Sequence, residues 1–152
     1  TKATNLYGPV EAYAYVVVDG KKEMKDSHKL TIKANIVEDF SSLTIEQKQQ
    51  SPMLETKAVV DLGSIAAGKH LKGQIRVKNI GVNPLHIRRA YSADKQIMLK
   101  PCKAVKSSRT GVIQVDINTA GRNPGKYSRE VVIISNDYEH SIQKVTLMWT
   151  VQ

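Results

Sequence analysis

The chain has 152 residues, 41% of them apolar, which is enough for one globular domain with a sizeable core and excludes a wholly disordered chain. Its formal net charge is +9, and all of the excess lies after Val60, because the first 60 residues carry 8 Lys and 8 acidic side chains. No apolar run approaches the roughly 18 residues of a membrane helix. The single cysteine, Cys102, excludes an internal disulfide and is interpreted as a structural residue.

Residues 1–40 predict two strands joined by a loop. The first stretch, YGPVEAYAYVVVDG, runs from Tyr7 to Gly20 as a glycine-led turn, a long strand and a tight turn. The second strand, HKLTIKANI, follows. Residues 41–57 then form a polar connector, in which Thr44 and Gln47 have the spacing of a capping box and Pro52 stops the short helix that we predict there.

From residue 58 to 152, apolar and polar residues alternate with a period of two. In HLKGQIRVKN, at residues 70–79, one face carries Leu71, Gly73, Ile75 and Val77, and the other is mostly basic, with Lys72, Gln74, Arg76 and Lys78. The inward residues predicted in this and the later strands are Leu71, Gly73, Ile75, Val77, Leu85, Ile87, Ile97, Leu99, Ile113, Val115, Ile117, Val145, Leu147, Trp149 and Val151. About seven short strands in 95 residues predict an all-β, immunoglobulin-like (Ig-like) β-sandwich, with a small barrel as the alternative.

The two strands of residues 1–40 repeat the last two strands of the chain. Placing Gly8 on Gly125 aligns the first strands at an offset of 117 residues, and HKLTIKANI then aligns with QKVTLMWTV at an offset of 115. The alignment also places Asp19 on Asn136. We interpret residues 1–40 as the C-terminal hairpin of a preceding, incomplete Ig-like repeat, residues 41–57 as a linker and residues 58–152 as a complete Ig-like domain.

A series of short motifs resembles a known bacterial family. The order is D-L-G-x-I-x-x-G from Asp61 to Gly68, K-N-x-G from Lys78 to Gly81, and P-L-x-I from Pro84. With the closing segment INTAGRNPGKYSREVVIISNDYEHSIQKVTLMWTV, these residues resemble domain-of-unknown-function family 1573, which is related to the ASPM/Hydin-like (ASH) and major-sperm-protein modules. The resemblance covers residues 58–152, and its closing part also fits residues 1–40.

The resemblance implies an Ig-like sandwich, often in tandem, in a Bacteroides-type protein exported to the periplasm or cell surface. Family members commonly carry a Cys-Gly-Cys after the strand that matches LHIRRA. This chain has Ser92, Ala93 and Asp94 near that place, so no thiol or metal role is carried over. The family supplies no catalytic residues to transfer.

No pattern in the chain indicates catalysis. The four histidines, His28, His70, His86 and His140, lack the close partners that metal sites show, and no nucleophile, phosphate-loop or paired-carboxylate signature occurs. We therefore predict a protein that is not an enzyme and has no cofactor.

Basic residues on predicted strands provide the candidate binding surface, a positive face made of Lys72, Arg76, Lys78, Arg88 and Arg89. Aromatic residues make up 5% of the chain, which disfavours nucleic acid as the partner. We expect instead an unidentified protein or envelope component, bound by face packing or by strand pairing, which could also join two chains. The alternative is a glycan-binding module, for which Tyr13, Tyr15 and Tyr91 are the candidate residues.

Overall fold

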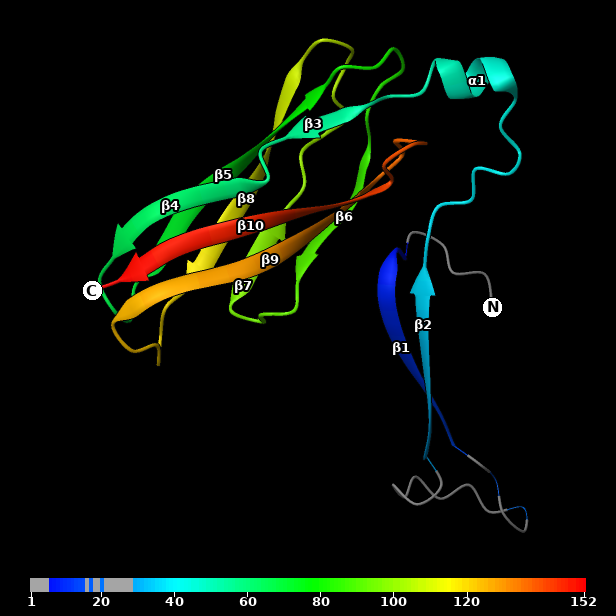
Figure 1. Cartoon of the computed structure of the whole chain (residues 1–152). Coiled ribbons are helices and arrows are strands. Elements are labelled where there is room, and N and C mark those ends of the chain that lie inside the picture. The colour runs from blue at the N-terminus through cyan, green and yellow to red at the C-terminus, as the bar shows by residue number, and fades with distance from the viewer. Residues whose placement is uncertain (1–5, 16, 18–19, 21–28) are drawn as a thin grey trace. The chain divides into compact units, whose positions relative to one another are not determined.

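The computed structural model describes residues 6–15, 17, 20 and 29–152. The chain divides into two units, Thr1–Val37 and Glu38–Gln152, and each is described by itself. In the first unit, β1 (Gly8–Tyr15) and β2 (Lys29–Ile36) form an antiparallel hairpin, drawn in blue and cyan in Figure 1. The predicted match of Asp19 to Asn136 lies outside the described residues.

The second unit is an Ig-like β-sandwich of two four-stranded sheets (Figure 1). One sheet has the strand order β4-β10-β9-β6 and the other β3-β5-β8-β7. The strands are β3 (Leu54–Thr56), β4 (Val59–Ile65), β5 (His70–Asn79), β6 (Ile87–Ser92), β7 (Ile97–Lys100), β8 (Thr110–Asn118), β9 (Gly125–Ser135) and β10 (Ile142–Val151). Neighbours pair antiparallel except β4 with β10, which are parallel. The predicted sandwich is confirmed, and the two separate sheets exclude the barrel.

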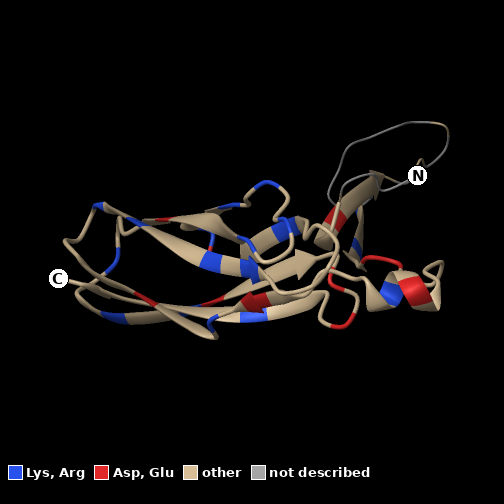
Figure 2. Ribbon diagram, turned by 90° about the horizontal axis from the view of Figure 1, so that it is seen from above, with Lys and Arg blue, Asp and Glu red and all other residues tan. Residues whose placement is uncertain are grey.

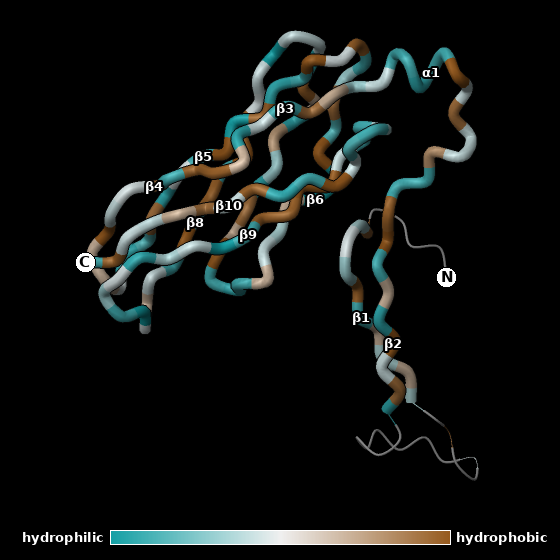
Figure 3. The backbone as a smooth tube through the Cα atoms, in the orientation of Figure 1, coloured by the Kyte–Doolittle hydropathy of each residue, from teal (hydrophilic) through white to brown (hydrophobic). Residues whose placement is uncertain are grey.

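The core lies between the two sheets, where the alternation placed it. In the register of β5 and β8, the buried Leu71 pairs with Ile117 and the buried Ile75 with Ile113, while Trp149 of β10 is 2% exposed. Figure 3 shows the corresponding brown apolar positions interspersed with teal hydrophilic ones along these strands. Because successive side chains point to opposite faces, the same pattern leaves the outer faces polar.

The close approach of β4 to β5 explains the glycine in the apolar row of β5. A Cβ atom added at Gly73 would lie 2.4 Å from the side chain of Leu62, which packs over this position from β4. Gly73 therefore makes room for Leu62 at the point where the two sheets come together.

The predicted short helix is present as α1 (Ile45–Gln49). Thr44 accepts a hydrogen bond from the Gln47 amide at 3.2 Å, and the Gln47 side chain accepts one from the Thr44 amide at 2.9 Å, so the predicted capping box forms. In the described part of the chain, no helix is long and apolar enough to cross a membrane.

The segment predicted as a linker, residues 41–57, contributes a strand to the sandwich. Its strand β3 pairs with the end of β5, with Leu54 opposite Asn79. Next to it, Met53 accepts a hydrogen bond from the Ile80 amide at 2.9 Å, and the side chain of Gln143 donates one to the Leu54 carbonyl, also at 2.9 Å. The sandwich therefore begins before Ala58.

The start of β6 also differs from the prediction, which placed Leu85 and Ile87 on one strand. Leu85 is fully buried but exchanges two backbone hydrogen bonds of 2.9 Å with Val105, outside any named strand. The strand β6 begins only at Ile87, so the buried side chain was predicted correctly while its pairing was not.

Candidate interaction surface

The outer face of the sheet β3-β5-β8-β7 carries a row of basic side chains. Lys72, Arg76 and Lys78 alternate with the buried residues of β5 and are all exposed. Opposite them in β8 lie Asp116, Val112 and Thr110, in that order. In the described part of the chain, none of the three basic side chains forms an ion pair. We call these three residues the β5 basic row.

Acidic side chains on this face are few. The Asp116 carboxylate accepts a hydrogen bond from His70 Nδ1 at 2.7 Å, and both side chains are substantially exposed. Glu55 of β3 lies opposite Lys78. Since Lys100 adds another exposed positive charge from β7, the face stays net positive.

Arg88 and Arg89 do not lie on this face. They belong to β6, which is an edge strand of the other sheet, so the predicted single positive face of five residues is corrected to the β5 basic row. The Arg88 guanidinium donates two hydrogen bonds to the Glu38 carboxylate, at 2.9 and 2.8 Å, and Arg89 lies over the ring of Tyr91 at 4.6 Å. Figure 2 shows blue basic positions on the strands of both layers.

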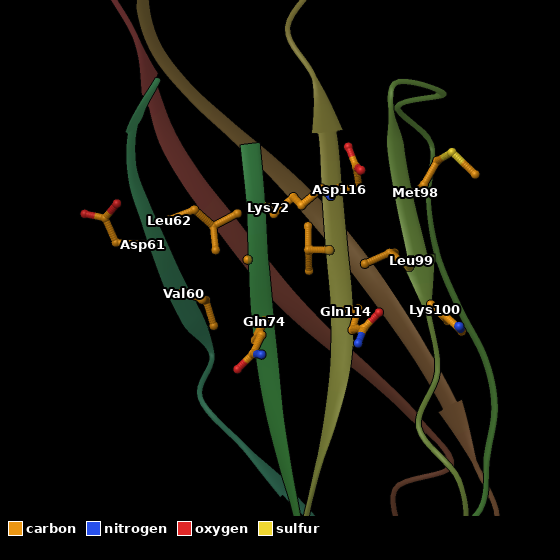
Figure 4. A pocket seen from close by; sticks show the side chains of 12 residues that line it. Val60, Asp61, Leu62, Lys72, Gln74, Met98, Leu99, Lys100, Gln114 and Asp116 are labelled. Carbon is orange, nitrogen blue, oxygen red and sulfur yellow. The ribbon is translucent and has the colours of Figure 1, made fainter. Parts of the chain in front are cut away.

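A depression of about 850 Å³ lies beside the β5 basic row (Figure 4). Its lining comes from β4, β5, β7 and β8 and comprises Val60, Asp61, Leu62, Lys72, Gly73, Gln74, Met98, Leu99, Lys100, Gln114, Val115 and Asp116. Figure 4 shows Leu62 reaching toward β5 while the Asp61 carboxylate points away from it. The lining therefore combines apolar side chains, such as Leu62 and Leu99, with charged ones, such as Lys100.

The family model described as "HYDIN/CFA65/VesB-like, Ig-like domain" matches residues 52–148. The chain belongs to this family. No match was found among curated protein sequences. Membership of an Ig-like family indicates a structural or interaction module and supports contacts with other proteins.

Several solved structures are similar to this HYDIN/CFA65/VesB-like chain, and the Porphyromonas structure shares its fold. A Porphyromonas gingivalis W83 protein of unknown function has a TM-score of 0.68 at 16% identity, and the match covers 95% of this chain and 66% of that one. The VesB protease of Vibrio cholerae has a TM-score of 0.48 at 12% identity, and the match covers 65% of this chain and 31% of the protease chain. The seventh ASH/PapD-like domain of human CEP192 has a TM-score of 0.48 at 9% identity, covering 78% of this chain and 95% of that domain.

Within the described residues, no group of three His, Cys, Asp or Glu side chains could hold a metal ion. Cys102 is half-buried against the core, and its burial raises the pKa of the thiol, which keeps it protonated at neutral pH. Its sulfur lies 2.8 Å from where a Cβ atom of Gly111 would be, so it fills a tight space.

The three tyrosines considered for glycan binding are not gathered on one unit. Tyr13 and Tyr15 belong to β1 of the first unit, and Tyr91 belongs to β6 of the second. The Lys29 ammonium lies over the Tyr13 ring at 3.9 Å, as Arg89 does over Tyr91.

One buried cluster of charged side chains was not predicted from the sequence. The Asp94 carboxylate accepts hydrogen bonds from Arg122 at 2.6 Å and Arg129 at 3.1 Å, and Arg122 also lies over the rings of Tyr127 and Trp149. The side chain of Arg122 is only 8% exposed. Because 28 and 35 residues separate the two arginines from Asp94, no local pattern could reveal the cluster.

Asp94 makes stability depend on acid pH. Burial raises the pKa of its carboxyl, but hydrogen bonds from Arg122, Gln96 and Arg129 and the charge of Arg122 outweigh this and lower the pKa below its usual value. The stabilisation is thus present above the unfolded-state pKa of about 3.9 and is lost as pH falls through the lower folded-state value. Asp94→Asn should melt well below wild type at pH 7, and thermal unfolding from pH 7 to 2.5 should show the gap closing in acid. Glu139→Gln, at an exposed position, is the control, and a gap independent of pH would contradict the ion-pair role.

Proposed function

We propose that the Glu38–Gln152 domain is a non-catalytic interaction module of an exported, envelope-associated protein of the Bacteroides type, and that it binds an acidic protein surface. The observation that carries the proposal is the β5 basic row, in which Lys72, Arg76 and Lys78 lack ion-pair partners within the described residues. The export and the family 1573 assignment rest on the sequence motifs from Asp61 to Ile87.

The spacing of the row suits an extended or flat acidic partner. On one face of a strand, residues two apart, such as Arg76 and Lys78, lie about 7 Å apart, and residues four apart, such as Lys72 and Arg76, lie about 13 Å apart. The positive charges therefore repel one another until a partner neutralises them. Asp116 and Glu55 offset this charge only in part, since Asp116 is already bonded to His70. Charge complementarity of this kind speeds association and selects the partner.

Face packing suits this sandwich better than strand pairing at an edge. In the sheet β3-β5-β8-β7, the edge strands have only 3 and 4 residues. In the other sheet, both edge strands carry a register shift, between Ile87 and Arg89 for β6 and opposite Met148 to Thr150 for β4. Short or bulged edges hinder the addition of another strand, whereas the outward-facing residues of β5 are exposed along the whole strand.

A charge-reversal experiment tests this role. The chain would be used to capture proteins from envelope extracts of the source organism, and each captured protein would then be purified and titrated. The variant Lys72→Glu/Arg76→Glu/Lys78→Glu should weaken binding by about tenfold or more, and raised salt should weaken the wild-type interaction.

The matched control reverses three exposed lysines elsewhere, Lys103→Glu/Lys106→Glu/Lys126→Glu, and so changes the net charge equally. It should weaken binding by less than about twofold. If both triple variants bind alike, or if no protein binds the wild-type chain, the proposed role of the row is wrong.

A further inference from the structure

The hairpin of the first unit has one apolar and one polar face. Cross-strand pairs place Ala12 opposite Ile32 and Ala14 opposite Leu30, with Val10 opposite Ala34 on the same side. The other face pairs Glu11 with Lys33, whose charged groups are 3.9 Å apart, and Tyr13 with Thr31. Figure 3 shows this mixture of brown and teal along β1 and β2.

The apolar face is exposed. Leu30 and Ile32 retain 55% and 50% of their accessible surface. A two-stranded hairpin is marginally stable in water by itself, so we expect other protein to cover an apolar face of this kind.

The hairpin register equals that of β9 and β10. Gly8 pairs with Ile36, and their aligned counterparts Gly125 and Val151 also pair. All eight residue pairs of β1 and β2 fall on pairs of β9 and β10 when the sequence offsets of 117 and 115 are applied. Both glycines have positive φ angles, 80° and 150°. The sequence repeat therefore corresponds to a repeated backbone pairing.

The apolar face of the hairpin corresponds to the core face of the sandwich. Leu30 and Ile32 align with Val145 and Leu147 of β10, which are 1% and 0% exposed. In the second unit, these residues are part of the core shared with the sheet β3-β5-β8-β7. The apolar face of the hairpin therefore corresponds to one side of a sandwich core, and a second sheet would form the other side.

We infer that β1 and β2 are the last two strands of a preceding Ig-like module, and that the cover of their apolar face is the remaining sheet of that module, encoded before Thr1. In the second unit, β3 to β8 occupy Leu54–Asn118, so about 65 further residues are needed. The Porphyromonas match covers 95% of this chain and so includes part of the first unit, which is about a quarter of the chain.

The reading frame before Thr1 gives the first test. The inference expects at least about 65 upstream residues, with period-two alternation and a K-N-x-G motif about 46 residues before Gly8, as Asn79 precedes Gly125. A frame that starts within a few residues of Thr1, or an upstream segment without strand pattern, overturns it.

The second test compares Ile32→Asp with Thr31→Asp in the full-length gene product. These neighbouring residues lie on opposite faces of β2 and are both exposed in the hairpin. If Ile32 is in a core, its replacement should lower one thermal unfolding transition by more than about 10 °C, and Thr31→Asp should leave it nearly unchanged. Hydrogen exchange should show loss of protection in Lys29–Ile36, with β5 and β8 still protected.

Equal effects of the two variants overturn the inference. So does a concentration-dependent dimer that Ile32→Asp alone dissociates, because a second copy would then be the cover. The charge-reversal experiment on the β5 basic row probes another unit, so either proposal can fail without the other.

Discussion

Replacing Asn79 with alanine is expected to lower the free energy of unfolding of the Glu38–Gln152 domain by about 3–5 kcal/mol. Its side chain is fully buried, and its oxygen accepts from the amides of Met53 (3.3 Å) and Gly81 (2.9 Å). Its nitrogen donates to the carbonyls of Asn83 (2.8 Å) and Val105 (2.9 Å). Alanine would remove all four bonds. It would leave the buried Gly81 amide without its side-chain acceptor, while the Val105 carbonyl would keep only its bond from the Leu85 amide. Chemical denaturation monitored by Trp149 fluorescence would measure the loss.

Two further variants separate hydrogen bonding from packing. Asn79→Asp keeps the shape but replaces the donor nitrogen by an acceptor, so it should destabilise the domain about as much as alanine does. Asn123→Ala, at an exposed position, should change the stability by less than about 0.5 kcal/mol. If both Asn79 variants change the free energy of unfolding only slightly, the hydrogen bonds of this side chain are not needed to stabilise the domain.

The K-N-x-G motif could be recognised in the sequence, but the structural reason for its glycine could not. Gly81 is in the motif because a Cβ atom there would lie 2.4 Å from the Ser51 carbonyl oxygen and 2.5 Å from the Met53 nitrogen. That segment arrives from 26 residues away along the chain to meet Asn79. The motif is thus visible in the sequence, whereas its contact with residues 51–53 could be found only from the fold.

Strand alternation predicted most of the sandwich because one face of each long strand is buried. The strands β5, β8 and β10 coincide closely with the predicted ones, and their inward residues form the core. The strand β3 was missed because its 3 residues are too few to show a period, and its pairing depends on distant side chains.

The candidate site was predicted only in part, for a related reason. Alternation shows which side chains point outward from a strand, but it does not show to which sheet the strand belongs. Consecutive strands β5 and β6 lie in different sheets, so Arg88 is separated from Arg76. The pairing of Arg88 with Glu38, 50 residues earlier, has no local signal in the sequence.

Asp137→Ala is expected to lower the free energy of unfolding by about 3–5 kcal/mol and to release β3. The Asp137 carboxylate is 1% exposed, and it accepts from the amides of Leu54 (2.9 Å), Glu139 (3.0 Å) and His140 (3.0 Å). Alanine would leave these amides unpaired, and hydrogen exchange should show the largest increase at Leu54–Thr56, because the Leu54 bond spans 83 residues and ties β3 to the end of β9. Glu139→Ala removes the same charge from an exposed neighbour and should leave exchange in β3 unchanged. If both variants increase hydrogen exchange in β3 equally, the negative charge, and not the hydrogen bonds of the Asp137 carboxylate, holds β3 in place.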